Sequence, residues 1–387
     1  MSLDYYKWDS QVGDTPTLFQ QPLFISPYTW EELKATAENL AAELTTAEQE
    51  LFNCPGLDAV IGFSPKLHSV FMDMRRKGPV PDAMRTLRFD FHYTTNGWHI
   101  SEVNSDVPGG YSEASCFTNM MAHYFPNTLT TGDVANKWTE AMMTAIGERK
   151  HVALLSAPGF LEDQQVTAFL ASQLQSRGVE TLLFHHPAQL SWQSGRAGVV
   201  SNGQRVDFGA IVRFYQGEWL AALPENSGWR WLFAQGKTPV ANPGISLLTE
   251  NKRWPLAWEY MRTKMPIWRA LLPECRDPRD PCWQSSDQWV VKGAFSNTGD
   301  AVYSHDTLTR KAWGDLCNKV ARNPTHWVVQ RRFEPLPIFS DAGEIYPCIG
   351  VYTVNGRAAG VYTRMGYKSV VDYSAKDGVL LIKETDD

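Results

Sequence analysis

The sequence predicts an α+β fold that contains an inserted small α/β lobe. Three observations lead to this prediction: a polar β-hairpin near residue 90, alternating strands and helices after residue 150, and a mixed final third. At 387 residues the chain is long enough for two or three lobes, each with its own core. We expect an N-terminal lobe over 1–150, the α/β lobe over 151–245 and a C-terminal lobe over 246–387.

Composition places the chain among folded globular proteins, with 43% hydrophobic and 12% aromatic residues. No run of about 18 apolar residues occurs and no signal-peptide core is visible, so we expect neither a membrane segment nor a leader. A net charge of −6 without a basic run argues against nucleic acid as a partner. The six cysteines lack CxxC spacing, which favours reduced thiols and a cytoplasmic protein.

The first expected element is a helix over 30–52, where leucines recur at helical spacing and Thr29 is a candidate cap. A β-hairpin follows over 87–105, because two runs of alternating apolar and polar residues flank Thr95-Asn96-Gly97. The turn decides which side chains share a face of this hairpin.

Two registers are open for the hairpin. A two-residue turn at Asn96-Gly97 places Asp90 opposite Val103. A three-residue loop over 95–97, with a left-handed glycine, places Asp90 opposite Glu102. Only the second register gathers four polar residues on one face, namely Arg88, Asp90, Glu102 and Asn104.

This polar face suits a magnesium–phosphate site. Mg²⁺ prefers oxygen ligands and is usually held by one or two carboxylates together with substrate phosphates. An arginine beside them can neutralise charge on a transferring phosphoryl group. The alternative is a solvated hairpin with ordinary cross-strand ion pairs, and the local pattern leaves both interpretations open.

A glycine loop over 106–110 comes next and leads into a helix over 112–124. A glycine turn at a helix N-terminus offers backbone N–H groups to an anion, although a simple tight turn capped by Ser112 explains it equally. Strands over 151–155, 179–184 and 207–213, with a helix over 162–177, then form the small α/β lobe.

The final third alternates short helices and strands. We expect helices and strands in the order 254–261, 289–293, 306–321, 327–332, a hairpin over 346–365 turning at Asn355-Gly356, and 379–384. Lys292 ends an apolar strand and precedes a Gly/Ser/Thr loop that contains Ser296 and Gly299. That combination suits nucleotide phosphates, but a surface lysine beside a hairpin loop is the commoner explanation. Neither a Walker A loop nor a GxGxxG motif is present.

Two further residues are open to two interpretations. Gln330 lies on a strand before a Pro-bounded connection, where backbone groups can meet an adenine edge or simply continue a core strand. Arg364 lies late in the 346–365 hairpin and is either an anion clamp or surface charge.

Taken together, the motifs resemble the synthetase domain of the glutathionylspermidine synthase family, a permuted branch of the ATP-grasp ligases. Five segments carry the resemblance in order: Arg-Phe-Asp at 88–90 with Glu-x-Asn at 102–104, the aromatic segment 211–220, Asn251-Lys252, Val291-Lys292 with its loop, and Gln330 with the hairpin ending at Arg364. The resemblance implies a permuted ATP-grasp fold like that of glutathione synthetase. It implies a metal-binding hairpin in 1–150, a pre-ATP-grasp lobe over 151–245 and a nucleotide-binding lobe over 246–387.

The resemblance also implies an ATP-dependent carboxylate–amine ligase that forms an amide through an acyl phosphate. Its cofactors are ATP and Mg²⁺, and its substrates are an amino-acid or peptide carboxylate and an amine or polyamine. The family pattern assigns two Mg²⁺ to Asp90, Glu102 and Asn104, the nucleotide to Lys252, Lys292, Ser296, Gly299 and Gln330, and the acyl phosphate and carboxylate to Arg88 and Arg364.

The sequence departs from the family at two points. Val107-Pro108-Gly109-Gly110 stands where the family has small hydroxyl residues that cradle glutathione, which argues against glutathione as the substrate. No residues are left for the amidase domain of the bifunctional members, so we expect ligation without hydrolysis. Loops 106–110 and 273–288 are candidate lids.

Two other functions compete with the ligase. A nucleotide-binding regulatory or scaffold protein would keep the fold without turnover, although it has no need of a second metal. A small-molecule kinase would require a hydroxyl acceptor and a general base near Asp90. The substrates and the oligomeric state are not predicted.

Overall fold

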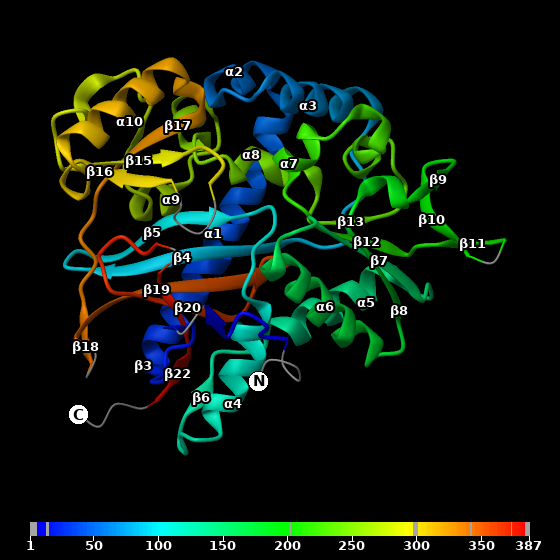
Figure 1. Ribbon diagram of the computed structural model, residues 1–387, viewed down its shortest axis with the longest axis horizontal. Coiled ribbons are helices and arrows are strands. Elements are labelled where there is room, and N and C mark those ends of the chain that lie inside the picture. Colours follow the sequence, from blue (N-terminus) through cyan, green and yellow to red (C-terminus); the bar gives the residue numbers. More distant parts are fainter. Residues whose placement is uncertain are drawn as a thin grey trace.

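The largest sheet joins two distant parts of the chain (Figure 1). The computed structural model describes residues 6–12, 15–201, 203–296, 301–340, 343–372 and 374–383. The sheet has the order β21-β20-β19-β4-β5, with β18 pairing β19. Its strands are β4 (Thr86–Thr94), β5 (Gly97–Asn104), β18 (Ile338–Ser340), β19 (Gly343–Val354), β20 (Arg357–Gly366) and β21 (Lys376–Gly378).

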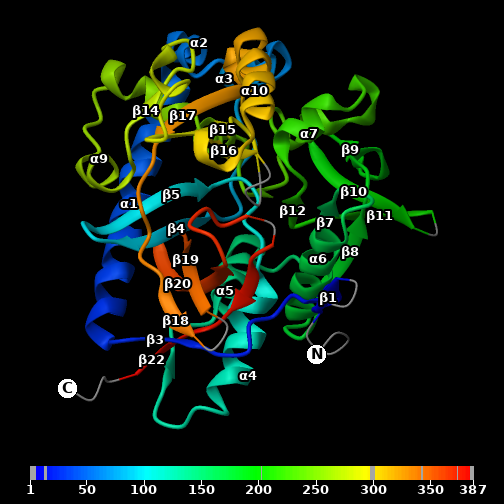
Figure 2. The same cartoon turned by 60° about the vertical axis from the view of Figure 1, so that its left-hand side comes forward.

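The two faces of this central sheet differ in polarity. Phe89, Phe91 and Ile100 point from β4 and β5 into the main hydrophobic core, where they join leucines of α1 (Pro27–Asn53). Successive strand residues point to opposite faces, so the polar residues between them lie on the other side. Helix α1 therefore covers one face of the sheet and leaves the other for the site (Figure 2).

Helix α1 begins earlier than expected. Ser26, not Thr29, is its N-cap, because the Ser26 side chain accepts a hydrogen bond from the Thr29 backbone at 3.1 Å. Pro27 at the first helical position favours the same start. Short helix α2 (Asp58–Ile61) and helix α3 (Pro65–Lys77) follow.

A four-stranded parallel sheet forms a second layer, in the order β13-β12-β7-β8. Its members are β7 (His151–Ser156), β8 (Glu180–Phe184), β12 (Ala210–Phe214) and β13 (Val240–Ala241). The helices packed with it are α5 (Val134–Ile146) and α6 (Leu161–Gln175). A meander of β9 (Ser191–Gln193), β10 (Arg196–Ser201) and β11 (Gln204–Asp207) extends beyond this sheet in Figure 1.

A smaller antiparallel sheet lies over the polar face of the central sheet (Figures 1 and 2). It has the order β14-β17-β15-β16, with β14 (Cys275–Arg276), β15 (Trp289–Gly293), β16 (Val302–Ser304) and β17 (Trp327–Arg331). Helix α10 (Arg310–Arg322) packs against it through a separate core that includes Trp283 and Trp313. Helices α8 (Leu247–Glu250), α9 (Pro266–Leu271) and the 3-10 helix Trp254–Tyr260 connect this part to the parallel sheet.

Short strands form two smaller sheets. Strands β3 (Leu23–Ile25), β22 (Leu380–Ile382) and β6 (Leu129–Thr130) form one sheet, and β1 (Gln11–Val12) pairs with β2 (Thr15–Pro16). The expected helix over 112–124 is present over residues 111–122, and it contains a π-helical turn, Glu113–Phe117, directly before α4 (Thr118–Ala122). Helix α7 (Gly217–Ala222) follows β12.

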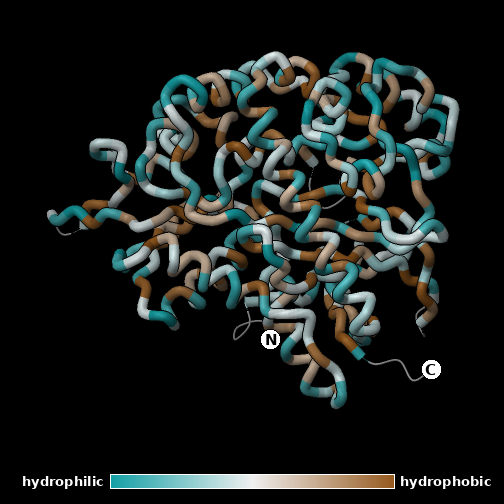
Figure 3. Tube along the Cα trace, turned by 180° about the vertical axis from the view of Figure 1, so that it is seen from behind, coloured by the Kyte–Doolittle hydropathy of each residue, from teal (hydrophilic) through white to brown (hydrophobic). Residues whose placement is uncertain are grey.

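Hydropathy follows this layering. Hydrophobic segments concentrate towards the inside of the molecule, and many outer loops are hydrophilic (Figure 3). Across the described residues, no helix combines the length and the apolarity that crossing a membrane requires. The mixed helix-and-sheet class is confirmed. The division at residues 150 and 245 stays a prediction, and strands from 1–150 and 246–387 share the central sheet.

Candidate functional site

The pairing of β4 with β5 determines which side chains share a face of the hairpin. It follows the second of the two expected registers. Asp90 pairs with Glu102 and Arg88 pairs with Asn104 across β4 and β5. These four side chains therefore share one face of the central sheet. Arg88 is 8% and Asp90 4% exposed, so the face is not a solvated surface.

The cause of this register differs from the predicted one. The turn contains two residues, Thr95 and Asn96, because Thr94 pairs with Gly97. The extra residue lies further along, where Phe91 pairs with Ile100 but Asp90 pairs with Glu102, so Ser101 is bulged. The expected left-handed glycine is present, with Gly97 at φ 90°. A β-bulge inside the strand, not a longer loop, restores the predicted pairing.

Arg88 and Asp90 form a buried, two-point ion pair. Arg88 Nε donates to Asp90 Oδ1 at 2.8 Å, and Nη2 donates to Oδ2 at 3.3 Å. Asn104 Nδ2 also donates to Asp90 Oδ2, at 3.1 Å. Burial raises the pKa of Asp90, but the Arg88 guanidinium outweighs it and leaves that pKa below its usual range. Asp90 is therefore an anion at neutral pH.

The opposing sheet supplies cations and an amide. Lys292 Nζ on β15 donates to the Ser101 carbonyl at 3.0 Å, and Gln330 Nε2 on β17 donates to the same oxygen at 3.4 Å. Both side chains are buried, so Lys292 is no surface lysine. Burial lowers the pKa of Lys292, with Lys252 adding to the effect and Glu102 opposing it. A phosphate bound beside Lys292 would favour the charged form of this lysine and raise its pKa again.

Lys252 lies in the turn after α8 and reaches the same place. Its Nζ is 3.5 Å from Glu102 Oε2 and donates to the Ser296 carbonyl. Ser296 Oγ donates in turn to the Gly293 carbonyl at 3.1 Å. Lys252 thus connects the loop after β15 to the Glu102 carboxylate. The predicted Gly299 lies outside the described residues.

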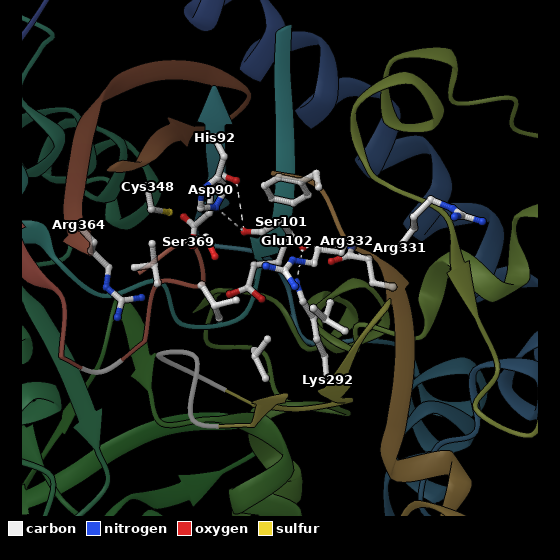
Figure 4. Close-up of a pocket in the computed structure, with 16 residues that line it drawn as sticks. Asp90, His92, Ser101, Glu102, Lys292, Arg331, Arg332, Cys348, Arg364 and Ser369 are labelled. Carbon is white, nitrogen blue, oxygen red and sulfur yellow. Dashed lines mark hydrogen bonds between the residues drawn. The ribbon is translucent and has the colours of Figure 1, made fainter. Parts of the chain in front are cut away.

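Of the predicted site residues, Asp90, Glu102, Lys292, Gln330 and Arg364 line one cleft between the two sheets, whose empty volume of about 680 Å³ includes space open to solvent. Lys252 lines a neighbouring cavity, whereas Arg88, Asn104 and Ser296 line neither of the two. Asp90 and Glu102 enter it from β4 and β5, Lys292 from β15 and Arg364 from β20 (Figure 4). A second cavity of about 330 Å³ adjoins the cleft, because Glu102, Lys292 and Gln330 line both. Arg364 Nη2 donates to the Asp372 carbonyl at 2.7 Å.

Several residues that the sequence did not single out also line the cleft, among them His92, Cys348, Arg331, Arg332 and Ser369. His92 stands on the same strand face as Asp90, and its Nε2 is 3.2 Å from Ser101 Oγ. Burial lowers the pKa of His92 to about 4, so it is neutral. Strand alternation could have identified His92. Cys348 comes from β19, two residues before the partner of Asp90, and only the β19–β4 pairing reveals it.

The donor set around Asp90 fits Mg²⁺. Asp90, Glu102 and Asn104 offer oxygen atoms, and Asn104 donates through Nδ2, which leaves its Oδ1 for a cation. In the part of the chain that is described, no three His, Cys, Asp or Glu side chains are arranged to enclose a metal. Mg²⁺ does not need such a cage, because it usually completes its shell with water and phosphate oxygens. The residues therefore suit a magnesium–nucleotide complex better than a metal alone.

The glycine loop 106–110 is built against the site. The Gly109 carbonyl accepts hydrogen bonds from Arg88 Nη1, at 2.8 Å, and from the Tyr352 hydroxyl. Gly110 has φ +95°, and a Cβ there would lie 2.8 Å from the Tyr362 ring. Gly109 has no atom within 4 Å of its own Cβ position. A side chain larger than hydrogen therefore fits at Gly109 but not at Gly110.

We expect Gly110→Ala to lower the free energy of unfolding by at least about 1 kcal/mol, because strain and the Tyr362 contact add. The matched change Gly109→Ala is expected to stay within about 0.5 kcal/mol of the wild type. Urea unfolding of both variants measures the difference. Equal stability of the two would contradict this account of the loop.

Sequence comparison identifies one family. A family model for the glutathionylspermidine synthase preATP-grasp region matches residues 24–377. That range includes both strands of the hairpin and every predicted nucleotide residue. A search of curated proteins finds no significant match.

Structure comparison adds relatives of low sequence identity. The chain is similar to a glutathione synthetase-like effector from Globodera pallida in its apo form, with a TM-score of 0.64 and 11% identity over 98% of this chain and 95% of that one. It is also similar to a protein described as a γ-glutamylcysteine synthetase from Methylobacillus flagellatus, with a TM-score of 0.45 and 11% identity over 88% of each chain. The first likeness shows a glutathione synthetase-like fold.

Proposed function

Because the chain belongs to the glutathionylspermidine synthase preATP-grasp family, we propose that it is an ATP-dependent carboxylate–amine ligase with a permuted ATP-grasp fold and an inserted α/β lobe. One observation carries the proposal. Paired carboxylates from β4 and β5 face Lys292 and Gln330 across a cleft between two sheets. That arrangement offers an anionic side for metal and a cationic side for phosphate.

The proposed residue roles are those that the family resemblance implies, and the contacts above support those of Asp90, Lys252 and Lys292. Lys252 and Lys292 hold the phosphates of ATP, while Ser296, Gly299 and Gln330 form the rest of the nucleotide side. Asp90, Glu102 and Asn104 hold Mg²⁺, which would offset the charge that develops on the transferred phosphoryl group. Arg88 and Arg364 orient the substrate carboxylate and stabilise its acyl phosphate.

The reaction proposed is phosphorylation of a carboxylate by ATP, followed by attack of an amine that releases phosphate and leaves an amide. No covalent enzyme nucleophile is required. The carboxylate substrate is an amino acid or peptide, and the acceptor is an amine or polyamine. Val107-Pro108-Gly109-Gly110 stands in place of the small hydroxyl residues that the family uses for glutathione, which supports a carboxylate other than glutathione. The six free cysteines support a cytoplasmic location.

A screen of carboxylates and amines for Mg²⁺-dependent ADP release tests the proposal, with product mass as the second readout. We expect at least one pair to release ADP and to yield the mass of an amide. Glu102→Gln serves as the inactive control. Tight ATP binding without turnover across the panel would favour the regulatory or scaffold alternative. A product that gains a phosphate on a hydroxyl group would identify a small-molecule kinase instead.

A further inference from the structure

A buried histidine of the cleft has no role in the reaction proposed above. His92 follows Asp90 by two residues on β4 and lines the cleft. Its Nε2 is 3.2 Å from Ser101 Oγ on the neighbouring strand β5 (Figure 4). The Ser101 hydroxyl donates to the Asp90 carbonyl at 3.5 Å, so the N–H of His92 Nε2 is the donor to Ser101. The other ring nitrogen, Nδ1, has no hydrogen-bond partner among the described residues.

Ser101 is the bulged residue of β5. Every other residue of this strand, from Gly97 to Asn104, pairs with a residue of β4, whereas Ser101 has no partner there. A bulged residue lies outside the ladder, so strand pairing does not fix its orientation. The hydrogen bond from His92 to the Ser101 side chain supplies the missing constraint at this point.

The backbone carbonyl of Ser101 accepts from two residues of the opposing sheet. Lys292 Nζ on β15 donates to it at 3.0 Å, and Gln330 Nε2 on β17 donates at 3.4 Å. Because β15 and β17 are neighbouring strands of the smaller sheet, this one carbonyl connects the two sheets across the cleft. Unlike Lys252, which is 3.5 Å from Glu102, Lys292 forms no ion pair with a carboxylate of the described residues. The orientation of Lys292 therefore depends on the Ser101 carbonyl.

We propose that His92 is a positioning residue for the nucleotide. By holding the Ser101 side chain, it fixes the bulge whose carbonyl orients Lys292 and Gln330 in the cleft. The proposal rests on the nucleotide side of the ligase function above and adds the residue that sets its geometry. Without this hydrogen bond the bulge has more than one orientation, and ATP must first select the one that binds it. The loss therefore falls on nucleotide affinity and not on the chemical step.

Binding of the Mg²⁺ complex of ADP, measured by calorimetry, tests the role of His92. His92→Phe keeps an aromatic ring beside Phe333 but has no donor, and we expect it to bind about fivefold more weakly, as is typical of one lost neutral hydrogen bond. His92→Gln places an amide N–H near the position of Nε2 and is expected to restore most of the affinity. In the ligase reaction, His92→Phe is expected to raise the KM for ATP and to leave kcat within about twofold of the wild type.

His99→Phe is the matched control. His99 lies on β5, its ring stacks on Phe333 with centroids 5.7 Å apart, and it lines neither the cleft nor the adjoining cavity. Its Nδ1 is 3.3 Å from Thr94 Oγ1, so this change also removes a histidine hydrogen bond from the hairpin. We expect His99→Phe to bind ADP like the wild type.

Ser101→Ala shows whether His92 acts through Ser101. We expect the same loss of ADP affinity as for His92→Phe and no further loss when the two changes are combined, because both remove one hydrogen bond. Losses that add, or a folded His92→Phe variant that binds ADP like the wild type, would overturn the role of His92. A wild type that binds ADP with this dependence on His92 but forms no amide in the ADP-release screen contradicts the ligase chemistry alone, so the two failures are distinguishable.

Discussion

Asp90→Asn is expected to lower the rate of ATP consumption about 1000-fold, the loss typical of removing a group that stabilises transition-state charge. The carboxylate is a proposed metal ligand and the partner that holds Arg88 in place through two hydrogen bonds. The amide keeps the shape of the side chain but removes its charge. Steady-state ADP release with the best substrate pair measures the effect.

The same change breaks a buried ion pair, so stability must be separated from activity. Loss of one partner leaves a buried charge uncompensated and costs about 3 kcal/mol. Asp58→Asn is the matched control, because Asp58 forms a comparable two-point pair with Arg75, at 2.6 Å and 2.9 Å, from residues that do not line the cleft. We expect it to lose stability and keep turnover. If Asp90→Asn loses no more activity than Asp58→Asn, Asp90 has no role in the chemistry.

The hairpin shows how far local sequence can predict a site. Alternation of polar and apolar residues placed Arg88 and Asp90 on one face, and the requirement that Asp90 oppose Glu102 selected the register. That pairing is confirmed. The bulge at Ser101 was not predictable, because any one extra residue between the turn and Glu102 gives the same pairing.

The rest of the cleft depends on contacts between distant segments. Cys348 reaches the site only because β19 pairs with β4, and Lys292 lies opposite Glu102 only because two sheets face each other. Nothing in a local window specifies such pairings. The family resemblance supplied that information, because it rests on the order of short motifs along the whole chain. The family model confirms the resemblance. Helices α3 and α5, by contrast, begin at N-caps that local sequence can identify, Ser64 and Asp133.

The segment directly after β5 is fixed by a second buried ion pair. Asp106 accepts from Arg213 Nη1 at 3.0 Å, from the Gly217 amide at 2.9 Å and from Ser246 Oγ at 2.7 Å. The side chains of Asp106 and Arg213 are 1% and 0% exposed. Burial raises the pKa of Asp106, but Arg213 and the other donors outweigh it and hold that pKa below its usual range. This ion pair connects the segment after β5 to β12 of the parallel sheet.

Asp106→Asn is therefore expected to lower the free energy of unfolding by about 3–5 kcal/mol at pH 7, because Arg213 stays buried without a carboxylate. The contribution of a carboxylate with a lowered pKa is present above its unfolded pKa of about 3.9 and disappears as the pH falls below it. The difference in free energy of unfolding between the variant and the wild type should thus become smaller in acid.

Asp207→Asn is the control, because Asp207 forms an exposed ion pair with Arg205 at 2.6 Å. Its expected change in the free energy of unfolding is below about 1 kcal/mol. Urea midpoints at pH 7 and at pH 3, which lies below the unfolded pKa, measure both variants. A gap that does not depend on pH would mean that packing around Asp106, and not its charge, holds β5 against the parallel sheet.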